Sequence, residues 1–124
     1  MQRDEIRGGE PPPGTIIDFA PVLGHWINSN RQTRWIRRFE LYQRQEQLFM
    51  RTEAADGDWG EAPVTPYLDN IGERAFCARY RRDGFASLLA ANMNKGLWVI
   101  AAFHDFSDPD RANFLCREFY YRAR

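Results

Sequence analysis

The chain has 124 residues, which suffices for one domain but is too short for two independently folding halves. Hydrophobic residues make up 44% of it, and its four Trp, five Tyr and nine Phe can fill one core, which argues against a disordered chain. Seventeen basic residues balance seventeen acidic ones, and the pI is near 6.7. Without a net charge to attract polyanions, the chain is expected to bind neither nucleic acid nor an anionic membrane.

The first 14 residues combine charge, glycine and three consecutive prolines, which cannot enter a helix interior or a central strand. We therefore predict a flexible N-terminal arm over residues 1–14 and one folded domain over residues 15–124. No apolar run approaches the roughly 20 residues of a membrane-spanning helix, and the N-terminus has no apolar stretch typical of a secretion signal. A cytoplasmic location is the expectation.

From residue 15 onward, apolar residues recur mostly at every second position, a pattern typical of strands. Clusters of Gly, Asn, Asp and Pro separate the runs and predict short turns. The predicted strands are residues 23–28, 33–43, 47–54, 73–81, 85–93, 96–106 and 113–122. A weaker eighth segment, residues 61–68, contains Pro63 and Pro66 and is expected at an edge or in an irregular position.

Short connections between these segments predict that each strand pairs with the next one along the chain. The fold class is therefore all-β, an up-and-down antiparallel barrel of about eight strands, because closure removes the two edges that an open sheet would expose. Cys77 and Cys116 fall on strands that are not neighbours in this order, so free thiols are expected.

Gly24, His25 and Trp26 open the first strand, and Arg122 closes the last one. This pair resembles the G-x-W opening and final arginine of lipocalins and other calycins. The stretches LGHWINSN, TRWIRRFEL, DWGE and FSDPDRANFLCREFYYR together resemble small bacterial lipocalin-like proteins. The resemblance implies a lipocalin-like barrel over residues 15–122, with Arg122 stacked on Trp26 at the closed end of the barrel.

Polar residues on the first, second and last strands are the candidates for chemistry. If Trp26 points inward, alternation also turns Glu118 and Tyr120 toward the lumen, and strand pairing would bring Arg38 and Glu40 near them. A desolvated Glu beside an Arg could bind or protonate a ligand, because burial raises the pKa of a carboxyl group. A structural ion-pair network, or exposure on the outside of the barrel, would explain the same residues.

His104 lies late on the longest apolar strand, and both alternating faces of that strand are apolar, so alternation alone does not decide where it points. It could act as a general base or be a structural histidine. A strand that is apolar on both faces also predicts that one face is covered, by the N-terminal segment or by a second subunit in a homodimer.

These observations predict binding of a small, largely apolar molecule in the lumen of the barrel. The candidate ligand contacts are Trp26, Arg38, Tyr42, Phe76, Tyr80, Phe85, Trp98 and Tyr120. The alternative is a cofactor-free isomerase, cyclase or hydratase in the same cavity, with Glu40, Glu118 or His104 as the catalytic group, so whether the chain is an enzyme stays open. A third alternative, an interaction module, predicts a filled lumen and an apolar strip on the outside. No metal-ligand spacing, phosphate-binding loop or dinucleotide fingerprint is present, so no cofactor is expected.

Overall fold

The computed structural model describes residues 9–124, so the first eight residues of the predicted arm lie outside the described residues. Residues 9–16 are exposed, and a short 3-10 turn, η1 (Ala20–Val22), leads into the first strand. Nowhere in residues 9–124 is there a helix with the length and apolarity needed to cross a bilayer.

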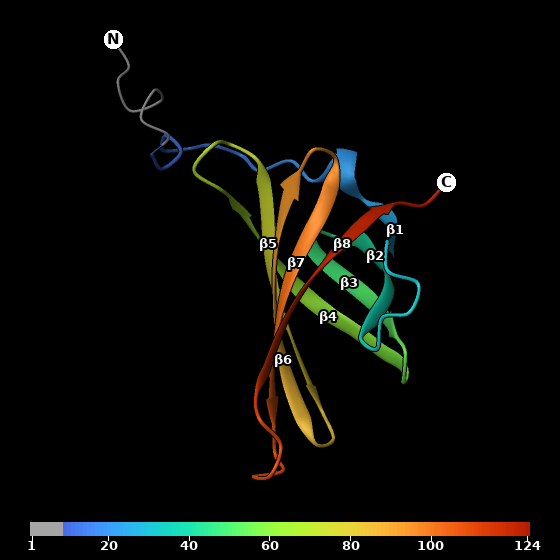
Figure 1. Cartoon of the computed structure of the whole chain (residues 1–124). Helices are drawn as coiled ribbons and strands as arrows, with labels where there is room; N and C mark the ends of the chain where they lie inside the picture. Colours follow the sequence, from blue (N-terminus) through green and yellow to red (C-terminus); the bar gives the residue numbers. More distant parts are fainter. Residues whose placement is uncertain (1–8) are drawn as a thin grey trace.

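Eight antiparallel strands follow η1 and close into one barrel in simple chain order (Figure 1). The strands are β1 (Gly24–Asn28), β2 (Ile36–Arg44), β3 (Gln47–Ala54), β4 (Gly57–Leu68), β5 (Arg74–Arg82), β6 (Phe85–Asn94), β7 (Leu97–Phe106) and β8 (Phe114–Arg122). Closure is made by β1 and β8, where Trp26 pairs with Arg122 and Asn28 pairs with Tyr120. The predicted up-and-down antiparallel barrel is confirmed, and its shape is consistent with a lipocalin-like fold.

The fourth strand is the one that differs most from its prediction. It begins at Gly57 and lies between β3 and β5 inside the barrel wall, not at an edge. Pro63 pairs with Phe49, whereas the ladder with β3 ends at Val64 and leaves Pro66 beyond it. A proline has no backbone N–H to donate to a neighbouring strand. The loss of these hydrogen bonds did not prevent the segment from forming a strand inside the barrel wall.

One end of the barrel is closed by the contact that the resemblance implied. The Arg122 guanidinium lies 4.6 Å from the centre of the Trp26 ring and donates to the backbone carbonyls of Leu23 and Pro21. The Trp26 indole donates to the Val22 carbonyl at 3.1 Å. At Gly24 the backbone φ is +121°, and a Cβ there would lie 2.9 Å from Nη1 of Arg122, so this position requires glycine.

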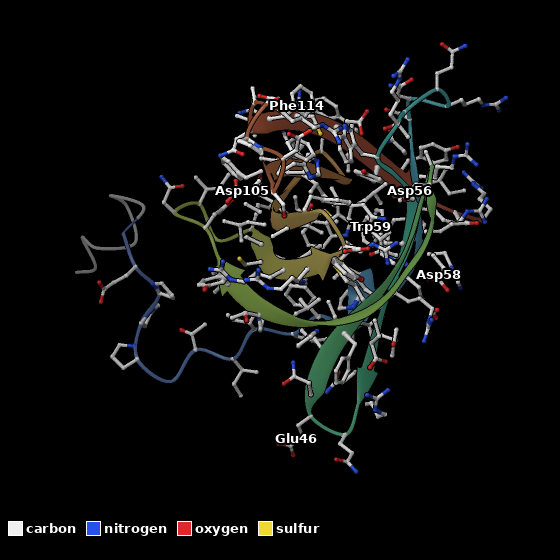
Figure 2. All side chains as sticks on the ribbon, turned by 90° about the horizontal axis from the view of Figure 1, so that it is seen from below. Glu46, Asp56, Asp58, Trp59, Asp105 and Phe114 are labelled. Atoms are coloured by element: carbon white, nitrogen blue, oxygen red, sulfur yellow. The ribbon has the colours of Figure 1, made fainter. Side chains whose placement is uncertain are left out.

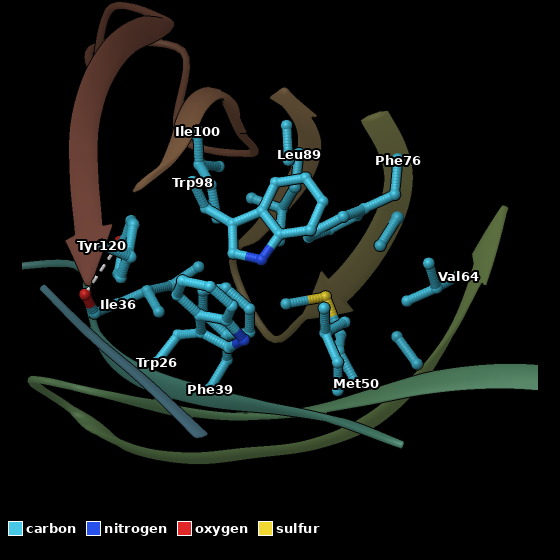
Figure 3. Close-up of a cluster of buried hydrophobic side chains, with 14 of the residues drawn as sticks. Trp26, Ile36, Phe39, Met50, Val64, Phe76, Leu89, Trp98, Ile100 and Tyr120 are labelled. Carbon is cyan, nitrogen blue, oxygen red and sulfur yellow. Dashed lines mark hydrogen bonds between the residues drawn. The ribbon is translucent and has the colours of Figure 1, made fainter. Parts of the chain in front are cut away.

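The half of the lumen next to this end is packed with large side chains (Figure 3). Six of them are at most 2% exposed: Phe39, Met50, Phe76, Leu89, Trp98 and Ile100. Trp98 lies among Phe19, Trp26 and Phe76, with ring centres 6.1, 6.0 and 4.8 Å away. Complete burial of side chains of this size supplies much of the stability of a domain this small.

A bulge in β2 changes which of its residues face the lumen. The register against β3 shifts between Ile36 and Arg38, so Ile36 and Phe39 both point inward and are each 1% exposed. Arg38 and Glu40 therefore lie on the outer surface, which corrects the expectation that they face Trp26 in the lumen. An extra residue in one strand reverses the alternation beyond it.

Candidate functional site

The end of the barrel opposite Trp26 and Arg122 carries the loops that join β1 to β2, β3 to β4, β5 to β6 and β7 to β8. We call it the far end; it is the lower end in Figure 1, and Figure 2 views the molecule from below. Trp59 lies near the middle of that view and Phe114 at its rim. Here the packed core gives way to rings and buried polar groups.

A buried histidine is the centre of this end. His104 on β7 is fully buried, and its Nδ1 lies 2.7 Å from the Ser87 hydroxyl on β6. The Cys116 thiol on β8 is 3.8 Å from Nε2. Burial, with a smaller contribution from the charge of Arg111, lowers the pKa of His104. The imidazole is therefore neutral at pH 7, with one nitrogen donating and the other accepting.

The Cys116 thiol is held in its neutral form as well. Burial, and to a lesser degree the charge of Glu118, raises the pKa of Cys116 to about 11. A thiol attacks as its thiolate, so Cys116 is not an activated nucleophile. The three polar groups form an uncharged cluster.

At the far end, the Trp35 indole is in contact with four other aromatic rings, those of His104 and three phenylalanines. The Trp35 indole, from the loop before β2, lies flat on the His104 imidazole with 3.8 Å between ring centres and 17° between planes. Phe85, Phe106 and Phe114 surround the same indole at 5.9, 6.2 and 6.1 Å. We call His104 and these three phenylalanines the aromatic box, with Trp35 inside it.

A second polar network ties the β1–β2 loop to β8. The Glu118 carboxylate accepts hydrogen bonds from the Thr33 hydroxyl at 2.7 Å, the Asn28 amide at 3.0 Å and the Asn30 amide at 3.3 Å. Tyr120 donates to the Ile36 carbonyl at 2.9 Å, and its burial holds the pKa of the phenol well above 10. The network fixes the loop that carries Trp35.

Tyr80 joins β5 to the neighbouring strands. Its hydroxyl lies 2.8 Å from the Gly60 carbonyl and 2.9 Å from the Thr52 hydroxyl. Burial raises the pKa of this phenol to about 12, so it remains protonated across the physiological range. Its hydrogen bonds therefore hold neighbouring strands of the wall together, which is a structural role.

The predicted site residues do not form one cluster. Trp26, Phe76 and Trp98 belong to the packed core, and Phe85 belongs to the aromatic box. Tyr80 and Tyr120 face inward but are bonded to the barrel wall.

Two predicted contacts, Arg38 and Tyr42, and the predicted catalytic Glu40 are on the outside of the barrel. Arg38 pairs with Glu53 at 3.3 Å, and Glu40 lies 3.7 Å from His25. The Tyr42 hydroxyl donates a hydrogen bond to the Glu61 carboxylate. Burial raises the pKa of Tyr42, and the hydrogen bond to Glu61 is the second largest cause of that rise. These side chains form separate pairs on the outside of the barrel, and exposure there was one of the alternatives for Arg38 and Glu40.

Of the three predicted catalytic groups, only His104 lies in the box. Glu118 is on the same side of the wall, but no hydrogen bond joins it to His104 within residues 9–124. In the same part of the chain, no three His, Cys, Asp or Glu side chains are grouped so that they could hold a metal ion.

Sequence reasoning missed Trp35 as a site residue. It precedes the bulge of β2, where alternation fails, so its direction could not be read from the strand. The pairing of Ser87 with His104 could have been found, because the β6–β7 turn fixes their register.

Comparisons with known proteins add no relative: no family model, no curated protein and no solved structure matches the chain.

Proposed function

We propose that the barrel binds a small, largely apolar molecule at its far end, in the aromatic box. The observation that carries this proposal is the Trp35 indole, supplied by a loop, lying 3.8 Å above a fully buried neutral imidazole. Ligand sites are mostly apolar and contain a few placed polar groups. Phe85, Phe106 and Phe114 are the apolar walls, and the Ser87–His104–Cys116 cluster is the polar floor.

The proposal places the ligand at the far end because the other half of the lumen is occupied. Met50, Leu89 and Trp98 are fully buried there. A ligand in that half would have to displace a close-packed core, at a cost of several kcal/mol. The rings predicted as ligand contacts, Trp26, Phe76 and Trp98, thus become the rigid base beneath the site.

The test is a nuclear magnetic resonance titration of the protein with toluene. We expect shifts in the signals of His104 and the three phenylalanines of the box. Phe85→Ala should weaken toluene binding about fivefold or more, because it removes one wall. Phe103→Ala, on the outer face of β7 and 43% exposed, is the matched control and should leave binding unchanged. If no signal of the box moves up to the solubility limit of toluene, the proposal fails.

A second candidate function is catalysis by a cofactor-free isomerase, cyclase or hydratase in the same box. The lowered pKa of His104 favours it, since a neutral imidazole can accept a proton. Native mass spectrometry of the protein isolated from its own cells would identify the bound molecule for an assay. Turnover that His104→Gln abolishes while binding survives would establish catalysis; an unchanged molecule after long incubation would exclude it.

We also propose that the chain is a lipocalin-like protein of the cytoplasm. The Trp26–Arg122 contact at the closed end and the simple strand order support the kinship with calycins. Cell fractionation with an antibody to the protein would test the location.

The outer face of β7 and β8 favours self-association, and we propose a homodimer through it. Phe103, Leu115, Phe119 and Tyr121 are each more than 40% exposed there. Large exposed apolar patches mark interaction sites. Sedimentation at rising protein concentration should show a dimer that Phe119→Ser weakens; a monomer at all concentrations would refute it.

A further inference from the structure

The aromatic box already holds a flat fused ring, because the Trp35 indole lies inside it. From this we infer that the ligand of the box is a flat, uncharged, fused-ring aromatic molecule, and that Trp35 occupies its place until it binds. The inference rests on the proposed function and goes further, by naming the ligand class and the group that the ligand displaces.

The geometry selects a flat ring. The planes of Trp35 and His104 are 17° apart at 3.8 Å, a separation that only a face-to-face contact permits. Phe85 meets the indole edge-on at 71°, and Phe114 lies at 27° to it. A saturated ring of similar volume is thicker and would press on the imidazole, so the box distinguishes shape as well as apolarity.

The charges around the box select a neutral ring. The imidazole floor is uncharged, and the Arg111 guanidinium lies 3.8 Å from the centre of the Phe106 ring. An aromatic cage would otherwise attract an organic cation. Here a cation would meet the positive charge of Arg111 at the wall of the box, and an anion would meet the negative charges of Asp105 and Glu118, which also act on His104.

Trp35 is bonded less firmly than two other tryptophans of the chain. The indole of Trp26 donates to the Val22 carbonyl at 3.1 Å, and that of Trp59 donates to the Asp56 carboxylate at 2.9 Å. The indole N–H of Trp35 makes no hydrogen bond within residues 9–124, and the side chain is only half-buried. Its ring can therefore leave the box without breaking a hydrogen bond of its own.

The loop that carries Trp35 is exposed along most of its length but is attached at both ends. Residues 29–32 and Arg34 are exposed, and Thr33 is the buried exception. Besides the bonds to Glu118, the Ser29 amide donates to the Phe119 carbonyl and the Ala55 amide donates to the Trp35 carbonyl, each at 2.8 Å. The loop backbone is thus held in place, and the part of the far end that can move is the half-buried Trp35 ring, by rotation about its own side-chain bonds.

The indole inside the box competes with any ligand. The apparent affinity equals the affinity for the empty box multiplied by the fraction of molecules in which the box is empty. Removing the Trp35 ring should therefore tighten the binding of a flat ring, and this result distinguishes competition from binding beside Trp35.

The experiment is a titration of the 15N-labelled protein, following the four tryptophan indole N–H signals. The probes are indole, which is flat and fused, and cyclohexanol, which is neither; Trp35→Phe assigns the Trp35 signal. We expect indole to shift the Trp35 signal strongly and to leave that of Trp26 unchanged, while cyclohexanol at equal concentration shifts neither. In Trp35→Ala, the dissociation constant for indole should fall about tenfold.

Each other outcome overturns the inference. If cyclohexanol or toluene displaces Trp35 as well as indole does, or if indole perturbs His104 without moving Trp35, the ligand class is wrong while the proposed function stands. If indole binds only Trp35→Ala, the site is an artificial hole and the inference fails. If indole, cyclohexanol and toluene all leave the box unperturbed in both proteins, both proposals fail.

Discussion

Trp26 and Trp35 lie at opposite ends of the same barrel, and their surroundings differ in kind. Trp26 is 2% exposed, is bonded through its indole N–H and has Arg122 over its face. Trp35 is half-buried, has no bond to its N–H within the described chain and has His104 under its face. The first tryptophan is fixed in place, whereas packing alone holds the second. This difference separates a structural end from the end where we propose binding.

The polar groups near the two rings differ in the same way. Around Trp26 they are backbone carbonyls of Leu23, Pro21 and Val22, all used to hold Arg122 or the indole. Around Trp35 they are side chains, Ser87, His104 and Cys116, bonded to one another beneath the ring. A displaced Trp26 would leave the buried Val22 carbonyl without its donor, at a cost of about 1–3 kcal/mol. A displaced Trp35 leaves the His104 cluster satisfied.

Removing the two indole rings in turn should change the free energy of unfolding more than any other substitution proposed here. Trp26→Ala should lower the free energy of unfolding by about 3–5 kcal/mol, as for other buried aromatic residues. Trp35→Ala should lower it by about 1–2 kcal/mol, because a half-buried side chain loses less contact. Guanidinium denaturation measures both. Equal losses of unfolding free energy would mean that Trp35 is part of the core, and the proposed difference between the two ends of the barrel would be wrong.

A smaller loss is expected from Arg122→Ala, about 1–2 kcal/mol for the stacking on Trp26 and the bonds to two carbonyls. Arg122→Lys should recover little, since an ammonium group lacks the planar fork that reaches both oxygens. Arg117→Ala, on the outer face of β8, is the matched control and should change stability by less than about 0.5 kcal/mol. A similar effect of Arg117→Ala and Arg122→Ala would remove the special role of the closed end.

The pH dependence of stability sharpens the contrast at the far end. Because burial keeps the pKa of His104 below 6.5, the folded chain resists protonation there, while the unfolded chain takes up a proton near pH 6.5. The stabilisation by neutral His104 is therefore complete above this pH and is lost as the pH falls below it. The slope that one such group adds is at most about 1.4 kcal/mol per pH unit.

Denaturation of the wild type and of His104→Gln at pH 7.5, 6.5 and 5.5 measures this contribution. The wild type should lose stability more steeply between pH 6.5 and 5.5 than the variant. His25→Gln, on the exposed outer face, is the control and should follow the wild type. Parallel curves for wild type and His104→Gln would show that the histidine is protonated equally in both states.

The smallest expected effect concerns the loop attachment. Glu118→Gln replaces one accepting oxygen with a donor that cannot serve Thr33, Asn28 and Asn30, and should cost about 1 kcal/mol or less in global stability. Exchange of the Ala55 amide hydrogen, which is bonded to the Trp35 carbonyl, should become faster. The amide of Ala123, bonded to the His25 carbonyl at the other end, should be unaffected. Unchanged exchange at Ala55 would show that the loop does not depend on Glu118.

The strand order could be predicted because it depends on local signals, whereas the closed end was predicted from the resemblance to calycins. Short turns fix which strands are neighbours, and the structure pairs Trp26 with Arg122 as the resemblance implied. Phe76 and Tyr80, two of the contacts predicted in the lumen, also point inward. Arg38, Glu40 and Tyr42 were placed wrongly because one bulged residue near Arg38 reverses the face of everything after it.

Alternation and turn residues alone predicted an all-β barrel with two free thiols, because these signals act over a few positions of the chain. The tryptophan–arginine contact was predicted from the resemblance to calycins. Only the tertiary structure decided that His104 points inward, since both faces of its strand are equally apolar. It alone also placed Trp35 on His104. Those two residues are far apart in the chain. The curvature of the barrel and the path of the β1–β2 loop bring the Trp35 ring onto His104, and no local sequence pattern predicts this contact.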